Sequence, residues 1–268
     1  MSGFSAAWLA LREPYDLRAR STKVLAAVSA ALAPLPALTI VDLACGTGST
    51  LRALAPHLPA HQNWKLVDND LGLLARAANA SHPRARVTTT PIDLVRDLEA
   101  ALDGPLDLVT TSGLLDLVSD SWLERLATEV AARGLPFYAA LSYDGRVAFE
   151  PFDPLDATII EAVHNHQRRD KGFGPALGPD AGKRTIAMFE AVGYFVVNAA
   201  ADWVMKPHDR DMLAILFDGW ASAAREVAQQ SLPEIATWLT HRSDALSHEK
   251  SSVRVGHIDV FAAPIARR

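Results

Sequence analysis

The sequence predicts an α/β fold: a doubly wound, mostly parallel sheet of seven strands with helices on both faces and an antiparallel last strand. Two observations predict it. Short apolar, β-branched runs alternate with helical segments between residues 38 and 145, which is typical of a parallel sheet. The chain then closes with SVRVGHIDVFAAP, residues 252–264, where alternating apolar residues indicate a further strand.

The first half of the chain predicts its elements in a regular order. Residues 4–33 are expected to be helical, with Pro14 dividing a short first helix from a second one over 16–33. Five strands are expected at 38–44, 63–70, 85–93, 105–113 and 135–143. Helices are expected between them at 48–56, 71–80, 94–102 and 121–134.

The pattern loosens after Asp144 and Gly145. We expect a short extra strand at 146–151, a glycine-rich loop at 168–182 and a strand at 195–205. Helices are expected at 156–167, 185–194, 209–229 and 233–249. In the third of these helices an apolar stripe is spaced for core packing, and a cover for the acceptor site or a dimer face are the alternatives.

Composition narrows the function. Hydrophobic residues make up 49% of the 268 residues, which provides a sizeable core, and a net charge of −5 argues against a nucleic-acid or membrane-surface binder. The one cysteine, Cys45, excludes an intrachain disulfide and a multi-thiolate metal site. We see no signal peptide and no bilayer-spanning run, so a cytoplasmic protein is expected.

The stretch IVDLACGTGST, residues 40–50, joins the first strand to a helix through a glycine-containing turn. Glycines at such a turn let the backbone approach a ligand closely. The third glycine of G-x-G-x-x-G is missing, which argues against a nicotinamide or flavin enzyme. The lysine-containing pattern of phosphate-binding loops is absent as well.

This turn resembles motif I of class I S-adenosylmethionine (SAM)-dependent methyltransferases, D-x-G-x-G-x-G. The matching residues are Asp42, Ala44, Gly46 and Gly48. Alanine replaces the first glycine, and it fits there if its backbone angles are ordinary.

Further residues carry the resemblance past the turn. The family places an acid after the second strand to hold both ribose hydroxyls; Asp68 takes this position, with Asp70 as second choice and Asn69 beside it. Near the adenine the resemblance places Asp93 and the Leu94 amide, and near the methionine it places Thr111, Ser112 and Gly113. Each acid alone also fits a loop carboxylate or a helix N-cap.

The resemblance implies a single methyltransferase domain over 1–268: a helical lid (1–37), a SAM-binding core (38–145) and acceptor-side insertions with the closing strands (146–268). Arg20 of the lid is expected to pair with the SAM carboxylate, and Arg12 and Tyr15 are further candidates for the same pocket. An ordinary surface helix is the alternative interpretation of this segment.

The segment HNHQRRDKGFGPALG, residues 164–178, is expected to face the acceptor through His164, Arg168 and Arg169. Its cations suit an anionic acceptor, and a solvated charge cluster is the alternative. His166 or Tyr143 is expected to act as general base where the acceptor loses a proton. No metal is expected, because residues i and i+2 of a helix do not face each other.

The expected reaction moves the SAM methyl group to a small-molecule acceptor and leaves S-adenosylhomocysteine. The Asn/Asp-Pro-Pro-Tyr signature of nucleic-acid amino-methyltransferases is missing after the fourth strand, where this chain has TTSG. A non-catalytic scaffold with this fold, a nucleotide-dependent oxidoreductase and a protein methyltransferase remain as alternatives. The sequence leaves the acceptor, the methylated atom and the choice between monomer and homodimer open.

Overall fold

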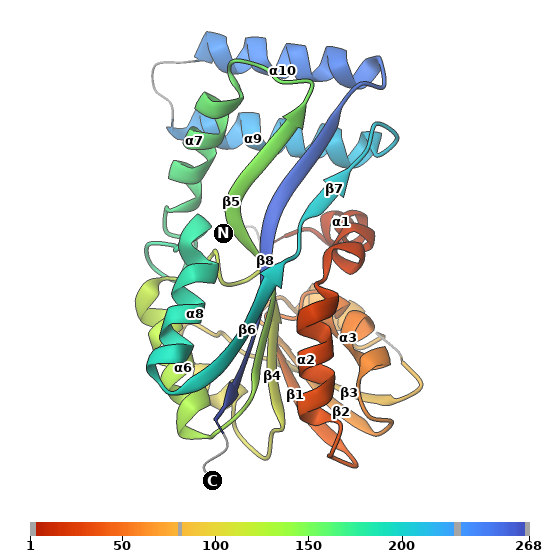
Figure 1. Cartoon of the computed structure of the whole chain (residues 1–268), viewed down its shortest axis with the longest axis vertical. Helices are drawn as coiled ribbons and strands as arrows, with labels where there is room; N and C mark the ends of the chain where they lie inside the picture. The colour runs from red at the N-terminus through yellow and green to blue at the C-terminus, as the bar shows by residue number, and fades with distance from the viewer. Residues whose placement is uncertain (1–3, 80–81, 228–231, 266–268) are drawn as a thin grey trace.

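A computed structural model describes residues 4–79, 82–227 and 232–265. One mixed sheet runs through the molecule in the strand order β3-β2-β1-β4-β5-β8-β6, and β7 pairs with β8 beside this path (Figure 1). The strands are β1 (Leu38–Leu43), β2 (Gln62–Asp68), β3 (Ala85–Pro91), β4 (Leu108–Ser112), β5 (Phe137–Glu150), β6 (Tyr194–Ala200), β7 (Trp203–Met205) and β8 (Ser252–Pro264).

The strand directions confirm the predicted fold class. β1 pairs in parallel with β2 and β4, β2 with β3, and β4 with β5, whereas β8 is antiparallel to β5 and β6. The three-residue strand β7 adds an eighth strand that the sequence did not predict as separate. The carboxyl ends of β1 to β4 meet at one edge of the sheet, where ligands bind in open α/β sheets.

Helices cover both faces of the sheet. The α-helices are α1 (Ala6–Ala19), α2 (Thr22–Leu32), α3 (Ser49–Leu54), α4 (Leu71–Ala77), α5 (Leu98–Ala101), α6 (Asp120–Ala132), α7 (Asp156–Gln167), α8 (Ala181–Ala191), α9 (Arg210–Val227) and α10 (Leu232–Ser247). One apolar cluster joins the sheet to α5, α6 and α8, and a second joins it to α2, α3 and α4. Short 3-10 turns lie at Ala55–His57 and Gly178–Asp180.

The predicted break at Pro14 is wrong, because α1 runs through Pro14 and ends at Ala19. The boundary lies at Ser21, which caps α2 by accepting from the Val24 N–H at 3.4 Å. The Ser21 N–H is held by the Asp259 carboxylate at 2.9 Å. A tertiary contact therefore sets the boundary, and local proline chemistry does not.

The predicted extra strand at 146–151 is a continuation of β5, which passes through register shifts against β8 and runs on to Glu150. The outer halves of β5 and β8 extend beyond the rest of the sheet and carry β7, α7, α9 and α10, as the upper part of Figure 1 shows. We call the outer halves of β5 and β8, together with β7, α7, α9 and α10, the cap. The rest of the sheet with the helices that cover it is the body. The cap has its own apolar cluster, which α1 joins through Trp8, Leu11 and Tyr15.

The strand predicted at 195–205 is split into β6 and β7. Asp202 lies in the break, and its carboxylate accepts from the His257 N–H at 3.3 Å and from Arg146 at 2.8 Å. The predicted stripe of α9 is mostly core, since Leu213, Leu216 and Phe217 are buried. The predicted helix ends at residues 80 and 228–229 lie outside the described residues.

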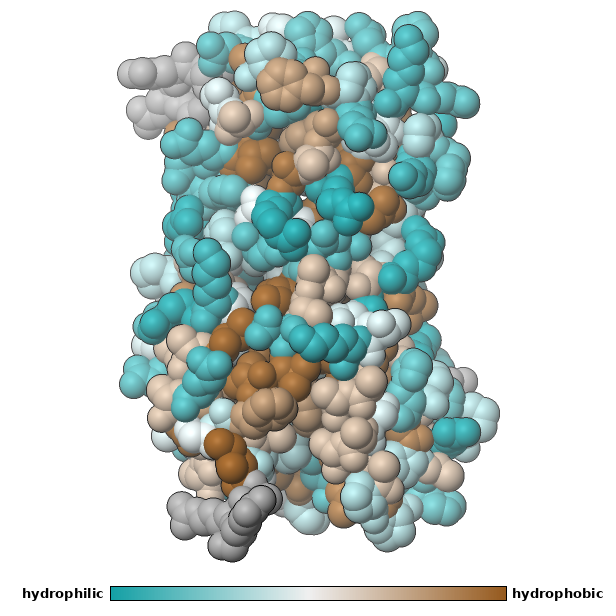
Figure 2. Space-filling view, in the orientation of Figure 1, coloured by the Kyte–Doolittle hydropathy of each residue, from teal (hydrophilic) through white to brown (hydrophobic). Residues whose placement is uncertain are grey.

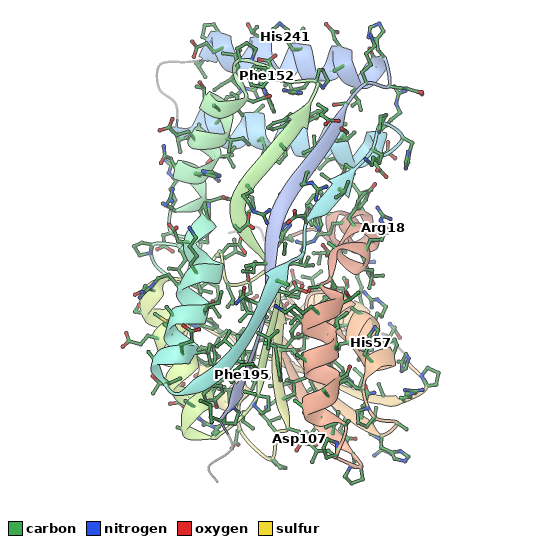
Figure 3. All side chains as sticks on the ribbon, in the orientation of Figure 1. Arg18, His57, Asp107, Phe152, Phe195 and His241 are labelled. Carbon is green, nitrogen blue, oxygen red and sulfur yellow. The ribbon has the colours of Figure 1, made fainter. Side chains whose placement is uncertain are left out.

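The surface seen in Figure 2 is more apolar over β6 in the body than over the outer cap helices. Phe195 of β6 points outward there and is 62% exposed (Figure 3). Within the described ranges, every helix is too short or too polar to cross a bilayer.

Candidate active site

The glycine turn after β1 is built from three residues in the left-handed region. Ala44, Gly46 and Gly48 have φ angles of 52°, 55° and 83°. The expectation of ordinary angles at Ala44 is therefore wrong: its backbone has the conformation that the glycine of the motif adopts without strain. The turn nevertheless forms, and Gly48 is the N-cap residue of α3.

Asp68 ends β2 beside this turn and is 9% exposed. One carboxylate oxygen accepts from the Gly46 N–H at 2.9 Å, and the other accepts from the Asp70 N–H at 3.0 Å. Asp70 is the N-cap of α4, where it accepts from two backbone amides, and Asn69 between them is exposed. Of the two acids, Asp68 thus lies against the turn, whereas Asp70 serves the helix.

Asp93 and Leu94 follow β3 at the same edge of the sheet. The Asp93 carboxylate accepts from the Val95 N–H at 3.0 Å and remains 42% exposed. Leu94 is buried, and its carbonyl accepts from the Trp122 indole N–H at 2.8 Å. Asp93 organises its own turn, and its second oxygen lies 3.7 Å from Arg96 Nε, an exposed ion pair that a ligand could replace.

Asp42 lies fully buried on β1 beneath the turn. One of its oxygens accepts from the Thr110 hydroxyl at 2.8 Å, and the other, Oδ2, has no partner among the described residues. Burial raises the pKa of Asp42 to about 7, although Thr110 and Arg20 oppose the rise. Carboxylates whose pKa is strongly shifted are found often at functional sites.

Helix α1 closes over the carboxyl edge of the sheet. A Cβ added at Gly46 would lie 3.2 Å from Leu9 of this helix, and one at Gly113 would lie 2.9 Å from the Arg12 guanidinium. Arg52 of α3 donates to Glu13 of α1 at 2.7 Å, which ties the helix to the turn. The segment predicted as a lid therefore packs against this edge of the sheet.

Arg20, at the end of α1, is 5% exposed. It contacts Ser112, which was expected near SAM, and Tyr138, which is buried. Its guanidinium donates to the Ser112 hydroxyl at 3.3 Å and to the Tyr138 hydroxyl at 3.2 Å, while its Nε has no partner among the described residues. The structure thus brings together Arg20 and Ser112, two of the residues expected near SAM.

Tyr143 of β5 contacts His164 of α7, where the cap begins. The Tyr143 hydroxyl and His164 Nε2 are 2.9 Å apart. Burial lowers the pKa of His164, with a further contribution from Arg168, and burial raises the pKa of Tyr143. The favoured state of this pair is therefore a neutral imidazole that accepts a hydrogen bond from the neutral phenol hydroxyl.

Arg12 and Asp16 of α1 complete this region with Trp203 of β7. Arg12 and the Trp203 indole each donate to Asp16 at 2.9 Å. Trp203 in turn contacts His257 of β8, with ring centroids 4.8 Å apart. Burial lowers the pKa of His257 to about 4, and the charge of Arg12 adds to this effect.

Asp116, in the segment after β4, adds a carboxylate to the same region. No side chain among the described residues hydrogen-bonds to it, and its own carbonyl accepts from the Gly178 N–H at 2.9 Å. Burial raises the pKa of Asp116 to about 6, against the opposing charge of Arg12. The negative charge of Asp116 also contributes to the raised pKa of Tyr143.

Four other predicted residues lie elsewhere. His166 contacts Glu226 of α9 at 3.1 Å, because it lies on a different face of α7 from His164. Arg168 and Arg169 are exposed and pair with Asp180 and Glu226 at 3.1 and 3.7 Å. The Tyr15 hydroxyl donates to Asp209 at 2.8 Å, which links α1 to the start of α9.

Asp116, His257, Asp16 and Trp203 were not predicted as site residues. A signal existed for two of them. Asp116 interrupts the apolar run LLDLV directly after a predicted strand, and His257 occupies a buried position of β8 two residues before buried Asp259. No group of three or more possible metal ligands occurs in the described part of the chain.

Residues 40–134 match a family model described as a methyltransferase domain. A search of curated protein sequences gives no match.

Three solved structures resemble the fold. One is a cyclopropane-fatty-acyl-phospholipid synthase-like protein from Lactobacillus casei, with 17% identity and a TM-score of 0.55 over 97% of this chain and 94% of that one. The second is the YcgJ protein from Bacillus subtilis, with 15% identity and a TM-score of 0.50 over 91% and 98%. The third is a SAM-dependent methyltransferase from Thiobacillus denitrificans in complex with S-adenosyl-L-homocysteine, with 16% identity and a TM-score of 0.46 over 97% and 99%. Identities this low show likeness of fold.

Proposed function

We propose that this chain, which has the class I methyltransferase fold and a methyltransferase domain at residues 40–134, transfers a methyl group from SAM to a small-molecule acceptor. The observation that carries the proposal is the position of Asp68. Its buried carboxylate is fixed beside the glycine turn by two backbone amides and lies at the carboxyl edge of the sheet. A carboxylate fixed in this way can accept from both hydroxyls of a ribose.

Unpartnered polar atoms support an amino-acid ligand at the same edge. Within the described residues, Arg20 Nε and Asp42 Oδ2 are buried without a partner. The methionine end of SAM carries a carboxylate and an ammonium, which match a guanidinium and a carboxylate in charge. Arg20 with Ser112 would hold the carboxylate, and Asp42 would offset the ammonium charge from beneath the turn.

When bound, SAM would supply a methyl group activated by its positive sulfonium. The protein would then contribute mainly alignment and exclusion of water. Helix α1 does both, since it covers the turn through Leu9 and reaches the end of β4 through Arg12.

The reactive group of the acceptor would lie between Arg12, Asp116 and the Tyr143–His164 pair. For a hydroxyl acceptor, we assign Asp116 as the proton acceptor. Its carboxylate has no side-chain partner among the described residues, and its pKa is raised to about 6. We assign His164, which bonds to Tyr143, to the acceptor end in place of His166, which pairs with Glu226. The ion pairs of Arg168 and Arg169 leave little positive charge for an anionic acceptor.

The test is titration calorimetry of the purified protein with SAM, S-adenosylhomocysteine and NAD. Micromolar binding of both adenosyl ligands and no binding of NAD are expected. Asp68→Asn should weaken SAM binding at least tenfold, about 1.4 kcal/mol. Asp70→Asn is the matched control, because asparagine caps a helix as well as aspartate does.

Two results would count against the proposal. NAD binding would contradict the proposed methyltransferase activity and favour an oxidoreductase. No binding of either adenosyl ligand would also contradict it and would favour a scaffold. Equal SAM affinity of Asp68→Asn and Asp70→Asn would remove Asp68 from the donor site. Circular dichroism of both variants shows whether the protein as a whole remains folded.

A further inference from the structure

Asp259 of β8 carries a carboxylate that is fully buried in the body. One of its oxygens accepts from the Ser21 N–H at 2.9 Å, and the other accepts from the Leu141 N–H at 2.8 Å. It thus joins β8 to the connection between α1 and α2 and to the middle of β5. Because burying a carboxylate is costly, a carboxylate that serves only to fill space in β8 is not expected here.

The carboxylate lies opposite a β-bulge in β5. The pairing of β5 with β8 shifts between Ala139 and Ser142, so Ala140 and Leu141 together lie opposite the single residue Asp259. Leu141 has a φ of 55°, which is uncommon for a residue other than glycine. Asp259 binds the N–H of this residue and so stabilises the bulge. Bulges occur often next to active sites, where they change the direction of side chains.

The bulge adjoins the end of β4, where the SAM carboxylate is proposed to bind. Ala140 pairs with Ser112 in the register of β4 and β5, and its carbonyl accepts from the Gly113 N–H at 3.0 Å. The bulge that Asp259 holds is therefore in direct backbone contact with the segment that Arg20 reaches.

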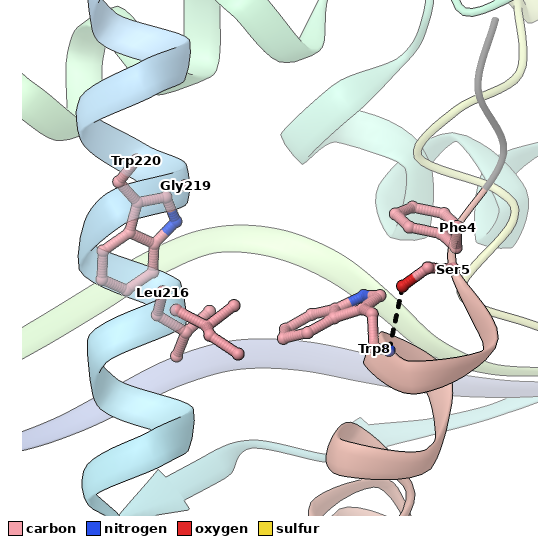
Figure 4. A pocket seen from close by; sticks show the side chains of 7 residues that line it. Phe4, Ser5, Trp8, Leu216, Gly219 and Trp220 are labelled. Carbon is pink, nitrogen blue, oxygen red and sulfur yellow. Dashed lines mark hydrogen bonds between the residues drawn. The ribbon is translucent and has the colours of Figure 1, made fainter.

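The two ends of α1 are held in different ways. At its start, the Ser5 hydroxyl accepts from the Trp8 N–H at 3.1 Å, and Figure 4 shows this bond across from α9. At its end, Arg20 is the C-cap residue, and the next residue, Ser21, donates its N–H to Asp259. Residues of the helix itself therefore fix its start, whereas Asp259 fixes the peptide that follows Arg20.

A second connection reaches the Arg20 guanidinium through the Tyr138 hydroxyl. This oxygen accepts from Arg20 Nη1 at 3.2 Å and donates to Asp259 at 3.5 Å. The other terminal nitrogen of Arg20 donates to the Ser112 hydroxyl at 3.3 Å. Asp259 thus acts on Arg20 both through the backbone and through a side chain.

We propose that Asp259 is a positioning residue of the donor site, which holds Arg20 in the orientation that binds the carboxylate of SAM. This rests on the proposed function, in which Arg20 and Ser112 bind that carboxylate. An arginine side chain has many rotamers, so a guanidinium that is fixed before the ligand arrives loses less entropy on binding. Asp259 itself would not touch SAM, because it is buried and both of its oxygens accept from backbone N–H groups.

Substitution by asparagine tests this arrangement. In Asp259→Asn one oxygen is replaced by an NH2 group, so a donor would face the N–H of either Ser21 or Leu141. The matched control is Asp107→Asn at the amino end of β4, where Asp107 accepts from the Thr39 N–H at 2.8 Å (Figure 3).

Tyr138→Phe is a second variant, which removes the hydroxyl between Arg20 and Asp259 and leaves both backbone contacts of Asp259 in place. Its control is Tyr194→Phe, which removes a buried hydroxyl that donates to the carbonyls of Val130 and Leu135.

The measurement is titration calorimetry of the natural protein and the four variants with SAM and with decarboxylated SAM, which lacks only the carboxylate. The natural protein should bind SAM about tenfold more tightly than decarboxylated SAM, because a charged hydrogen bond is lost with the carboxylate. Asp259→Asn should weaken SAM binding about fivefold and Tyr138→Phe about threefold, with decarboxylated SAM bound as in the natural protein. The two control variants should keep both affinities.

The two ligands separate the possible failures. If the natural protein does not bind SAM, the proposed function fails. If it binds both ligands equally well, or if Asp259→Asn and Tyr138→Phe both keep the natural preference for SAM, Asp259 does not position the carboxylate site. An equal loss of affinity for both ligands in Asp259→Asn would show that Asp259 serves the fold alone. Where circular dichroism shows that Asp259→Asn is unfolded, Tyr138→Phe decides, and an unchanged preference for SAM overturns the proposal.

Discussion

Two buried carboxylates, Asp156 in the cap and Asp42 in the body, lie in opposite kinds of surroundings. Both oxygens of Asp156 are used: one accepts from the Trp238 indole at 2.8 Å and from Arg242, and the other accepts from the Asp153 N–H at 2.9 Å. Asp42 has one bonded oxygen, one without a partner among the described residues, and a pKa raised to about 7. Asp156 is thus held by structural partners on both oxygens, whereas Asp42 keeps one oxygen that a ligand could use.

The largest expected effect comes from breaking the cap pair. Arg242 is 1% exposed, pairs with Asp156, donates to the Pro151 carbonyl at 2.7 Å and lies 4.5 Å from the Phe149 ring centroid. Arg242→Ala would leave Asp156 charged and buried, so the free energy of unfolding should fall by about 3 to 5 kcal/mol. Urea unfolding followed by circular dichroism measures this loss.

The matched control is Arg184→Ala, which breaks an exposed ion pair with Asp120 on the body and should leave unfolding nearly unchanged. If the cap pair serves structure alone, Arg242→Ala should bind SAM within about threefold of the natural affinity, which is a change of less than about 1 kcal/mol in binding free energy. The affinity is measured under conditions where the variant is folded. A much larger loss of SAM affinity would show that the cap also organises the donor site and would break the contrast.

The second effect tests His257, where body and cap join. Its pKa falls from an ordinary value of 6.5 to about 4 because it is buried. Between these values the unfolded chain binds a proton that the folded chain does not, so this contribution to stability is complete above pH 6.5 and is lost as the pH falls toward 4. The loss should reach about 3 kcal/mol.

Urea unfolding at several pH values between 4 and 7.5 measures this dependence. His257→Asn should flatten it, since asparagine can donate to the Val255 carbonyl as His257 Nδ1 does and does not titrate in this range. His61→Asn, a change at an exposed residue, should leave the dependence as it is in the natural protein. Equal slopes in the natural protein and His257→Asn would show that the imidazole is accessible to protons when folded.

The third effect has the opposite sign and concerns Asp116, in the region proposed for the acceptor. Asp116 has a pKa of about 6 in the folded protein, above the ordinary value of 3.8, so its ionised form costs stability. This cost is absent below about pH 4 and complete above about pH 6. Asp116→Asn should therefore stabilise the protein at pH 7.5 by about 1 to 3 kcal/mol and should change little at pH 4.

Thermal unfolding at the two pH values measures the gain, and Asp218→Asn on the exposed side of α9 serves as control. A stabilising change at a polar residue is expected where function and stability compete. Loss of stability at pH 7.5 would mean that the carboxylate has a structural partner, and Asp116 would then resemble Asp156 more than Asp42.

The body was more predictable from sequence than the cap because its signals are local. The turn at Ala44 to Gly48 and the acid at Asp68 follow their strands directly, and the parallel sheet brings those strand ends together. The region proposed for the acceptor combines Arg12 of α1, Asp116 after β4, Tyr143 of β5 and His164 of α7, which no local spacing relates.

The differences between prediction and structure have physical causes of the same kind. His164 and His166 are equally suitable by type, and only the packing of α7 against α9 decides which one faces Tyr143. The helix boundary at Ser21 depends on a carboxylate 238 residues away in the chain. Where a tertiary contact decides the outcome, local propensity is a weak guide.

The smallest effect concerns the strain in the donor turn. Ala44 has a φ of 52°, which costs an alanine more than a glycine, so Ala44→Gly should stabilise the protein by up to about 1 kcal/mol after the greater entropy of the unfolded glycine chain is counted. Ala53→Gly, in the right-handed helix α3, should destabilise it by about 1 kcal/mol. Guanidinium unfolding of both variants compares them. Equal losses would mean that Ala44 has ordinary angles in solution and that the turn after β1 holds no strain.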